Sequence, residues 1–321
     1  MANSDYRSLN ALMRHIRQTS GIKIAGSADK KALAQVGYFH GYKGYRYAGH
    51  AGKRIPYVTF GELRAVIRFD TQIKGLLYPM LMNLEMAMKN LALVEILDAA
   101  DSSRLNDVYS RLMPGTRKGK RAGKLEVIHQ SNEVLLRSYK RNNTIVRHYY
   151  DSPDEVVPVW ALMEVITLGH FARLLEQLCD PVMTDIAERW GLRRRDAELL
   201  PHIVFALTDL RNCVAHNGTA FDTRFRTASI RRPVSNLLVR EIGYPSSVTV
   251  RFETITDYFA LVVYLACCFG FPKRDIRTLL RQYGTLADDL RANVPLGVFD
   301  TIVHTDHRAK LQRLEQWVRS A

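Results

Sequence analysis

The chain has 321 residues, 47% of them hydrophobic, so it can bury a sizeable core as one large helical domain or two smaller ones. Its 46 Lys and Arg against 32 Asp and Glu give a formal charge of +14, which favours a polyanionic partner such as nucleic acid or an anionic membrane surface. The four cysteines form no C-x-x-C pair, which argues against a zinc site or a disulfide framework. No leader pattern or membrane-length apolar run is present, so we expect a cytoplasmic protein with no membrane partner.

The N-terminal segment combines helical periodicity with an aromatic tract. Residues 5–19 and 29–36 are predicted to form short helices. Residues 37–47 then alternate Gly, Tyr and basic side chains. Aromatic rings beside cations suit base stacking and phosphate contact, which makes Lys43 and Arg46 candidate RNA-binding residues. The alternative is that the glycines form turns while the tyrosines close the edge of a helical core.

The stretch 59–100 is strongly helical, and its spacing predicts one short helix and one long helix with a kink at Pro79. Glu85 and Lys89 are four residues apart, so the simplest interpretation is an ion pair within one helix. In the alternative interpretation, Glu85 turns inward and tunes a histidine of the motif at residues 210–217.

A basic run follows this helical stretch and is the best single candidate for contact with a phosphate backbone. The run is predicted to form a mobile loop, because its cations alternate with Gly and Ala. The alternative is a solvated run of charge with no ligand. Its candidate residues are Arg117, Lys118, Lys120, Arg121 and Lys124.

Helical periodicity dominates the rest of the chain. Strands and helices do not alternate in it as they would in a βαβ fold. Helices are predicted over residues 159–178 with a break at Gly169, 181–190, 196–216, 253–270, 273–291 and 307–319. A lone short strand is predicted at residues 247–252. His304 and His307 match only a weak two-histidine metal pattern, so we expect no metal site.

The most informative motif lies at residues 210–217, near the end of the helix predicted over 196–216. A helical wheel puts Asn212 and His216 together on the side opposite an apolar stripe, with Arg211 on the flank. A polar pair on such an apolar helix predicts a cleft or a second subunit facing it. Three consecutive arginines, Arg193, Arg194 and Arg195, introduce this helix and are further candidates for RNA contact.

These three side chains suit the cleavage of RNA without a metal. Attack of the 2′-OH on the adjacent phosphate needs a group that moves protons near neutral pH and a fixed cation for the developing charge. His216 and Arg211 supply them, and Asn212 can hold a phosphate oxygen or orient the histidine. The plain alternative is an ordinary helix end, with Asn217-Gly218 as a stop signal and Gly218 at the first non-helical position.

Several stretches together resemble the abortive-infection AbiD/AbiF-like family, whose catalytic module is a HEPN domain. Arg211 to His216 fits the R-x(4–6)-H motif of that domain, and Asn212 matches the Asn that often follows the Arg. Phe69-Asp70, leading to Glu85, resembles the F-D-x-x-L-R-x-L-L pattern of the family, although Lys74 stands at or beside its usual Arg. The W-x-x-x-E stretch has its counterpart in Trp160 to Glu164, and residues 29–47 resemble the tract before the first long helix.

The resemblance implies an all-α, HEPN-like helical bundle with additional N- and C-terminal helices, in three segments: 1–55, 56–225 and 226–321. It implies a metal-independent endoribonuclease of phage defence or a toxin, leaving a 2′,3′-cyclic phosphate and a 5′-OH. Arg211, Asn212 and His216 would be catalytic, with Glu85 and Glu164 in support. The expected partners are a second copy of the chain, which completes a composite site, and RNA, both as substrate and as a small non-coding RNA; no cofactor is expected.

Two other functions compete with the nuclease. A catalytically silent protein of the same fold would hold a structured RNA through its basic patches and would bind in a salt-sensitive way without cleavage. A helical interaction protein would use its charge only for solubility and would carry no nucleic acid. Regulation of DNA is disfavoured, because no helix-turn-helix spacing stands out.

Overall fold

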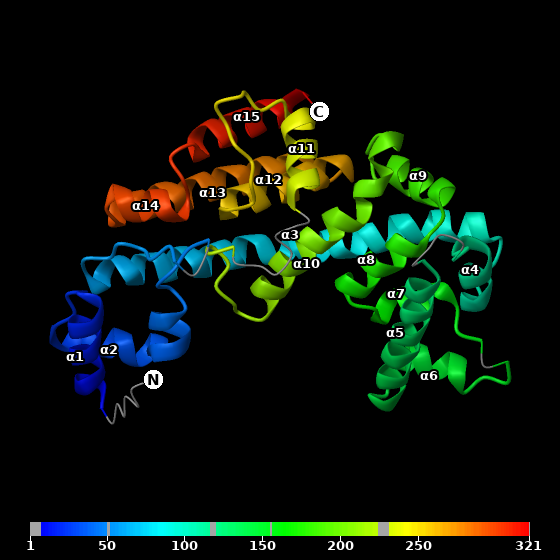
Figure 1. The fold of residues 1–321 in the computed structure, drawn as a ribbon, viewed down its shortest axis with the longest axis horizontal. Helices are drawn as coiled ribbons and strands as arrows, with labels where there is room; N and C mark the ends of the chain where they lie inside the picture. The colour runs from blue at the N-terminus through cyan, green and yellow to red at the C-terminus, as the bar shows by residue number, and fades with distance from the viewer. Residues whose placement is uncertain (1–7, 50–51, 116–119, 155, 224–230, 321) are drawn as a thin grey trace.

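The computed structural model describes residues 8–49, 52–115, 120–154, 156–223 and 231–320 (Figure 1). These residues form helices and connecting loops, with isolated bridges but no β-strand, which confirms the predicted all-α class. None of the helices in these ranges has the length and apolar composition of a membrane span. The α-helices are α1 (Leu9–Ser20), α2 (Gly26–Val36), α3 (Phe60–Ala100), α4 (Leu105–Leu112), α5 (Lys120–Lys140), α6 (Thr144–Tyr150), α7 (Val159–Val165), α8 (Leu168–Gln177), α9 (Asp180–Arg189), α10 (Leu200–Ala215), α11 (Arg231–Ile242), α12 (Ile255–Cys268), α13 (Lys273–Asn293), α14 (Leu296–Ile302) and α15 (His307–Ser320). A π-helical segment, η1 (Gly37–Lys43), follows α2, and a 3-10 segment, η2 (Arg194–Leu199), precedes α10.

The long helix α3 runs through the middle of the molecule and carries the other helices around it (Figure 1). Helices α1 and α2 lie at its N-terminal end, α4 to α9 surround its C-terminal end, and α11 to α15 cover one side. Helix α10 packs on both α3 and α8. All three segments predicted from the sequence contribute buried apolar residues to one continuous core.

The prediction of two helices between residues 59 and 100 is wrong, because α3 is a single helix that continues through Pro79. The buried positions Ile73, Leu77, Leu81 and Leu84 keep the same apolar stripe on both sides of the proline. Pro79 itself is exposed, so the backbone hydrogen bond that it removes is lost on the solvent side, where water can replace it. Continuous burial therefore outweighs the local cost of proline.

Two further predictions of local structure, the basic loop and the short strand, differ from what the structure shows. The basic run is not a loop at residues 120–124, which form the first turns of α5, while Arg117 and Lys118 lie outside the described residues. The strand predicted at 247–252 is absent. Val248, Val250 and Phe252 are indeed buried in alternation, but no neighbouring strand pairs with them. Alternate burial arises here from an irregular segment that lies along a helical core.

The aromatic tract at residues 37–47 mainly closes the core. Tyr42 and Tyr45 are buried, as the alternative interpretation of the tract predicted, and the Tyr45 hydroxyl donates to Asp70 Oδ2 at 2.7 Å. Burial, together with the Asp70 charge, raises the pKa of Tyr45. The Lys43 ammonium lies over the rings of Tyr38 and Phe39, 4.9 Å from each centroid. Among the side chains of this tract that the structure describes, Phe39 is the most exposed large aromatic, at 70%.

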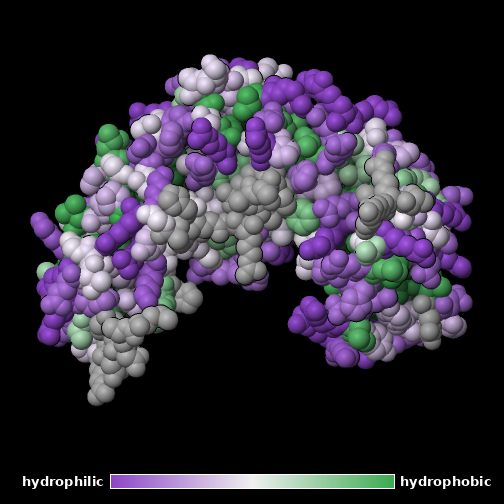
Figure 2. Space-filling model, viewed as in Figure 1, coloured by the Kyte–Doolittle hydropathy of each residue, from purple (hydrophilic) through white to green (hydrophobic). Residues whose placement is uncertain are grey.

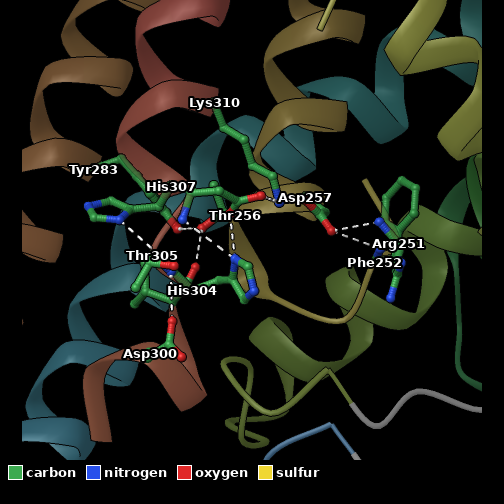
Figure 3. A network of polar contacts seen from close by, with 12 residues as sticks. Arg251, Phe252, Thr256, Asp257, Tyr283, Asp300, His304, Thr305, His307 and Lys310 are labelled. Atoms are coloured by element: carbon green, nitrogen blue, oxygen red, sulfur yellow. Dashed lines mark hydrogen bonds and ion pairs between the residues drawn. The ribbon is translucent and has the colours of Figure 1, made fainter. Parts of the chain in front are cut away.

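The C-terminal helices are held by a buried polar network (Figure 3). Lys310 on α15 donates to Asp257 Oδ1 on α12 at 2.7 Å, and both side chains are almost fully buried. The other oxygen of Asp257 accepts the backbone N–H groups of Arg251 and Phe252 at 3.0 and 2.9 Å. The network therefore joins α12, α15 and the segment before α12, and burial raises the pKa of Asp257 despite these partners.

Candidate functional site

The motif at residues 211–216 occupies the last turn of α10 and the residue that ends it. The helix buries Ile203, Leu207, Leu210 and Val214. Asn212 and His216 are exposed and Arg211 is partly exposed, as the helical wheel predicts. His216 donates its backbone N–H to the Asn212 carbonyl at 3.0 Å, so both side chains remain on one turn. The sequence therefore builds an exposed Arg–Asn–His cluster on the outer side of a core helix.

The helix ends one residue earlier than the simple stop signal implies. Asn217, not Gly218, is the first non-helical residue, with a left-handed φ of 54°. The N–H groups of Gly218 and Asn217 donate to the carbonyls of Cys213 and Val214 at 2.7 and 3.4 Å, the two-bond pattern that closes many helices. A side chain at residue 218 would meet Cys213 Sγ at 2.8 Å, so Gly218 is needed for this close approach.

Arg211 is oriented by Glu85, which lies 126 residues earlier on α3. Its Nε donates to Glu85 Oε2 at 2.8 Å, while Glu85 Oε1 accepts from Lys89 at 3.1 Å. Lys89 also donates to the Ile166 carbonyl at the end of α7, at 2.7 Å. Glu85 thus makes the intrahelical pair predicted for it and contacts the motif as well, but through Arg211 rather than His216.

A second carboxylate on α3, Asp70, anchors the loop that follows the motif. Asp70 is fully buried, and its Oδ1 accepts the backbone N–H groups of Ala220 and Phe221 at 2.8 and 2.9 Å. Its Oδ2 pairs with Lys74 at 2.9 Å. Lys74 in turn donates to Asn217 Oδ1 at 2.8 Å and to the Gly218 carbonyl at 3.1 Å. The turn after His216 is therefore fixed to α3 by a buried ion pair.

Asp70 and Lys74 were not among the residues predicted for the site. Asp70 occupies a position of the apolar stripe of α3, between Val66 and Ile73, where an isolated carboxylate would be costly to bury. A charge in such a position, followed by a lysine four residues later, is a sequence signal for a buried anchor. The loop that it binds, however, is about 150 residues away in the chain and could not be read from that signal.

The four cysteines are partly buried. Burial raises the pKa of the Cys213 thiol to about 12, and the nearby Asp70 and Asp222 act in the same direction. Burial likewise raises the pKa of Cys267 and Cys268 to about 11 and about 12. A thiol with such a pKa stays protonated near neutral pH and is a poor nucleophile. Within the described ranges, no group of three His, Cys, Asp or Glu side chains is arranged to hold a metal ion.

The candidate RNA-binding cations do not form one patch. Arg193 pairs with Glu241 at 3.1 Å and Arg194 with Glu188 at 3.2 Å, so acidic neighbours compensate both charges. Lys124 donates to the Met113 carbonyl at 2.8 Å. The Arg46 guanidinium lies over the rings of Tyr42 and Tyr47, at 5.4 and 5.5 Å. Arg121 and Arg195 are exposed, and the side chain of Lys120 lies outside the described part of the structure.

Glu164 is exposed on α7. Among the described residues, no hydrogen bond or ion pair joins it to Arg211 or His216, so the predicted support of the site by Glu164 stays a prediction.

The wider surroundings of the motif are concave. The end of α10 lies between two limbs of the molecule, α1 with α2 and α5 with α6 (Figure 1). The space-filling view shows the surface hollowed between these limbs (Figure 2). A long ligand or another chain could reach the motif from this side.

The fold and the cluster define an all-helical protein that presents an Arg–Asn–His motif, braced by two acidic residues of its longest helix, on a concave surface. The family of Abi-like proteins matches residues 31–222, which is more than half of the chain, so the chain belongs to this family. Membership indicates abortive infection, a form of phage defence, as its setting. No curated protein and no solved structure matches the chain significantly.

Proposed function

We propose that this protein is a HEPN-type, metal-independent endoribonuclease of abortive infection. The observation that carries the proposal is the exposed cluster of Arg211, Asn212 and His216 at the end of α10, with Arg211 held by Glu85. A polar triad on a helix that is otherwise buried, in a chain of charge +14, suits chemistry on a phosphate backbone.

The proposed reaction is an internal transfer of the phosphate. The ribose 2′-oxygen attacks the adjacent phosphorus, a new bond from phosphorus to the 2′-oxygen forms, and the bond to the 5′-oxygen breaks. One imidazole accepts the proton of the 2′-OH, and a protonated imidazole or water gives a proton to the leaving 5′-oxygen. The products are a 2′,3′-cyclic phosphate and a 5′-OH. His216 carries the proton, and Asn212 orients the phosphate or the imidazole.

Arg211 would stabilise the charge that develops on the phosphate. Glu85 engages its Nε, and Asn212 Oδ1 accepts weakly from Nη1 at 3.4 Å. No described residue is hydrogen-bonded to Nη2, and 28% of the side chain is exposed. A guanidinium fixed along one edge and open along another loses little entropy when it binds a phosphate oxygen.

A homodimer and a small non-coding RNA complete the proposal. Tyr78, Met82 and Met86 recur every four residues on α3 beside Glu85, and Tyr78 and Met86 are exposed, which suits the approach of a second copy next to the site. Two copies would bring two His216 side chains, one for each proton transfer. The positive charge suits a restraining RNA.

The test compares the wild type with His216→Ala and Arg211→Ala, using metal-free cleavage of RNA and analysis of the product ends. Each variant is expected to lose about 10²–10⁴-fold in rate, because it lacks the proton carrier or the phosphate cation. His129→Ala, which removes an exposed histidine on α5, is the matched control and should cleave normally. Wild-type cleavage by His216→Ala would refute the proposal. Tight RNA binding without cleavage by any of the proteins would replace it with the function of a silent RNA-binding protein.

A further inference from the structure

Helices α5, α6 and α7 form a limb whose surface carries a cluster of aromatic rings. Trp160 lies in the first turn of α7 and is 37% exposed, whereas Trp190 is fully buried in the core. The Trp160 ring contacts Tyr149 edge to face, with centroids 5.1 Å apart, and Tyr149 contacts His148 in the same way at 5.0 Å. The exposed part of the indole, beside Tyr149, offers an aromatic face to a ligand.

The same limb carries exposed cations that form no ion pair within the described part of the chain. The segment 134–150 contains no Asp or Glu, and Asp151, which follows it, accepts from the Tyr139 hydroxyl at 2.8 Å. Its cations are Arg137, Lys140, Arg141 and Arg147, all exposed. None of the four forms an ion pair with a carboxylate of the described residues, and Arg147 lies over the Tyr139 ring at 5.0 Å. This differs from Arg193 and Arg194, whose charges are compensated by glutamates.

The limb is joined to the motif by a short chain of contacts. The carbonyl of Ile166, at the end of α7, accepts from Lys89, which contacts Glu85, which in turn holds Arg211. Two side chains therefore separate the end of α7 from Arg211. The limb and the end of α10 also border the same hollow side of the molecule (Figures 1 and 2). A strand bound on the limb could continue to the motif.

We propose that the surface of this limb that carries Tyr149, Trp160, Lys140 and Arg141 binds single-stranded RNA and directs it to the Arg211–His216 cluster. Unpaired bases stack on the aromatic rings while the cations contact phosphates, the combination that sequence-tolerant single-strand sites use. A duplex is excluded as the preferred ligand, because its bases are already stacked and present no free face. The inference rests on the proposed nuclease, for which it names the form of the substrate and its binding surface.

Binding is measured in the His216→Ala background, so that cleavage does not interfere. The probe is a short fluorescein-labelled oligoadenylate, followed by anisotropy over a range of salt concentrations. Trp160→Ala is expected to weaken binding about tenfold or more, while Trp160→Phe, which keeps an aromatic face, should retain most of the affinity. The double variant Lys140→Ala/Arg141→Ala should reduce the salt slope by about 1.4, which corresponds to two phosphate contacts on a single strand.

The matched control is Arg274→Ala/Arg277→Ala, which removes two exposed charges from α13 that form no ion pair with any described residue. It should leave the affinity within about twofold, because α13 lies on the other side of α3 (Figure 1). Equal losses in the two double variants would show a non-specific charge effect and overturn the inference. Unchanged binding by Trp160→Ala, a preference for RNA duplex, or tighter binding to phosphatidylglycerol vesicles than to the oligonucleotide would also overturn it.

The two proposals can fail separately. If the wild type cleaves RNA but the limb variants bind and cleave normally, the nuclease stands and the limb is wrong. If the limb variants lose binding but no RNA is cleaved by the wild type, the nuclease fails and the limb remains a binding surface. Circular dichroism of each variant confirms that it has folded before it is used.

Discussion

Two buried aspartates, Asp70 on α3 and Asp257 on α12, use the same arrangement in different regions of the molecule. Each pairs with a buried lysine and accepts the N–H groups of two consecutive residues in a loop. Asp70 fixes residues 220–221, after the motif helix, and Asp257 fixes residues 251–252, before α12. A carboxylate on a helix can thus fix an irregular segment that has no backbone partner of its own.

The difference lies in what each anchored segment carries. The loop bound to Asp70 directly follows His216, and its lysine also holds Asn217. In the C-terminal network, Lys310 contacts a second acid, Asp306, at 3.3 Å, and His304 pairs with the same residue at 2.8 Å. These contacts tie α15 to its own preceding turn (Figure 3). Only the Asp70 anchor lies within the region that matches the family, so the same contacts serve the site in one case and the scaffold in the other.

The largest effect on stability is expected for Lys310→Ala, which leaves Asp257 buried without its cation. Breaking a buried pair in this way costs about 3–5 kcal/mol of unfolding free energy. Urea unfolding measures the loss, and RNA cleavage by the folded protein should be unchanged. The control is Arg308→Ala, which breaks the exposed pair with Asp288 and should cost less than about 1 kcal/mol. Equal losses for the two variants would mean that burial of the pair has no influence.

Asp70→Asn tests whether the corresponding anchor serves the site. The amide keeps the size of the side chain but loses the charge that pairs with Lys74, at a cost of about 1.5–3 kcal/mol. Cleavage should fall about a hundredfold at temperatures where the variant is folded, because the turn after His216 is no longer held in place. Folded Asp70→Asn with normal cleavage would make Asp70 only a scaffold residue, like Asp257.

Glu85→Gln separates the orientation of Arg211 from stability. Glu85 is only 14% exposed and also pairs with the buried Lys89, so the change in unfolding free energy should be about 1–3 kcal/mol. Cleavage should fall about tenfold, because the neutral amide holds the guanidinium less firmly. The measurement is the rate of cleavage at saturating RNA beside a urea curve. A large loss of stability with no loss of rate would contradict the assigned role.

The smallest effect is a pH dependence in the C-terminal region. Burial lowers the pKa of His307 below its usual 6.5, so the unfolded chain binds this proton more readily than the folded one. Stability is therefore full above pH 6.5 and decreases as the pH falls below it. His307→Gln should flatten this decrease in part, since burial also lowers the pKa of His15 and His170. Urea midpoints across this range test it, and an unchanged pH dependence in the variant would exclude His307 as a contributor.

The errors in the sequence predictions have a common physical origin. Pro79 predicts a kink, but the apolar stripe on either side of it is buried against several helices, and that burial keeps α3 in one piece. The alternation at 247–252 predicts a strand, but a strand requires a partner, which the described residues do not supply. In both cases the local sequence preference is real, but packing against the rest of the molecule outweighs it.

The amino-acid sequence left the role of the tyrosines at residues 37–47 open, but it predicted the all-helical class and the outward placement of Asn212 and His216. These follow from periodicity and side-chain chemistry, which act over a few residues. That Glu85 holds Arg211 across 126 residues, and Lys74 holds Asn217 across 143, follows from the packing of distant helices and is visible only in the folded molecule. Such pairs depend on how α3 and α10 pack, and helical periodicity specifies which face is buried but not which residue of another helix it meets.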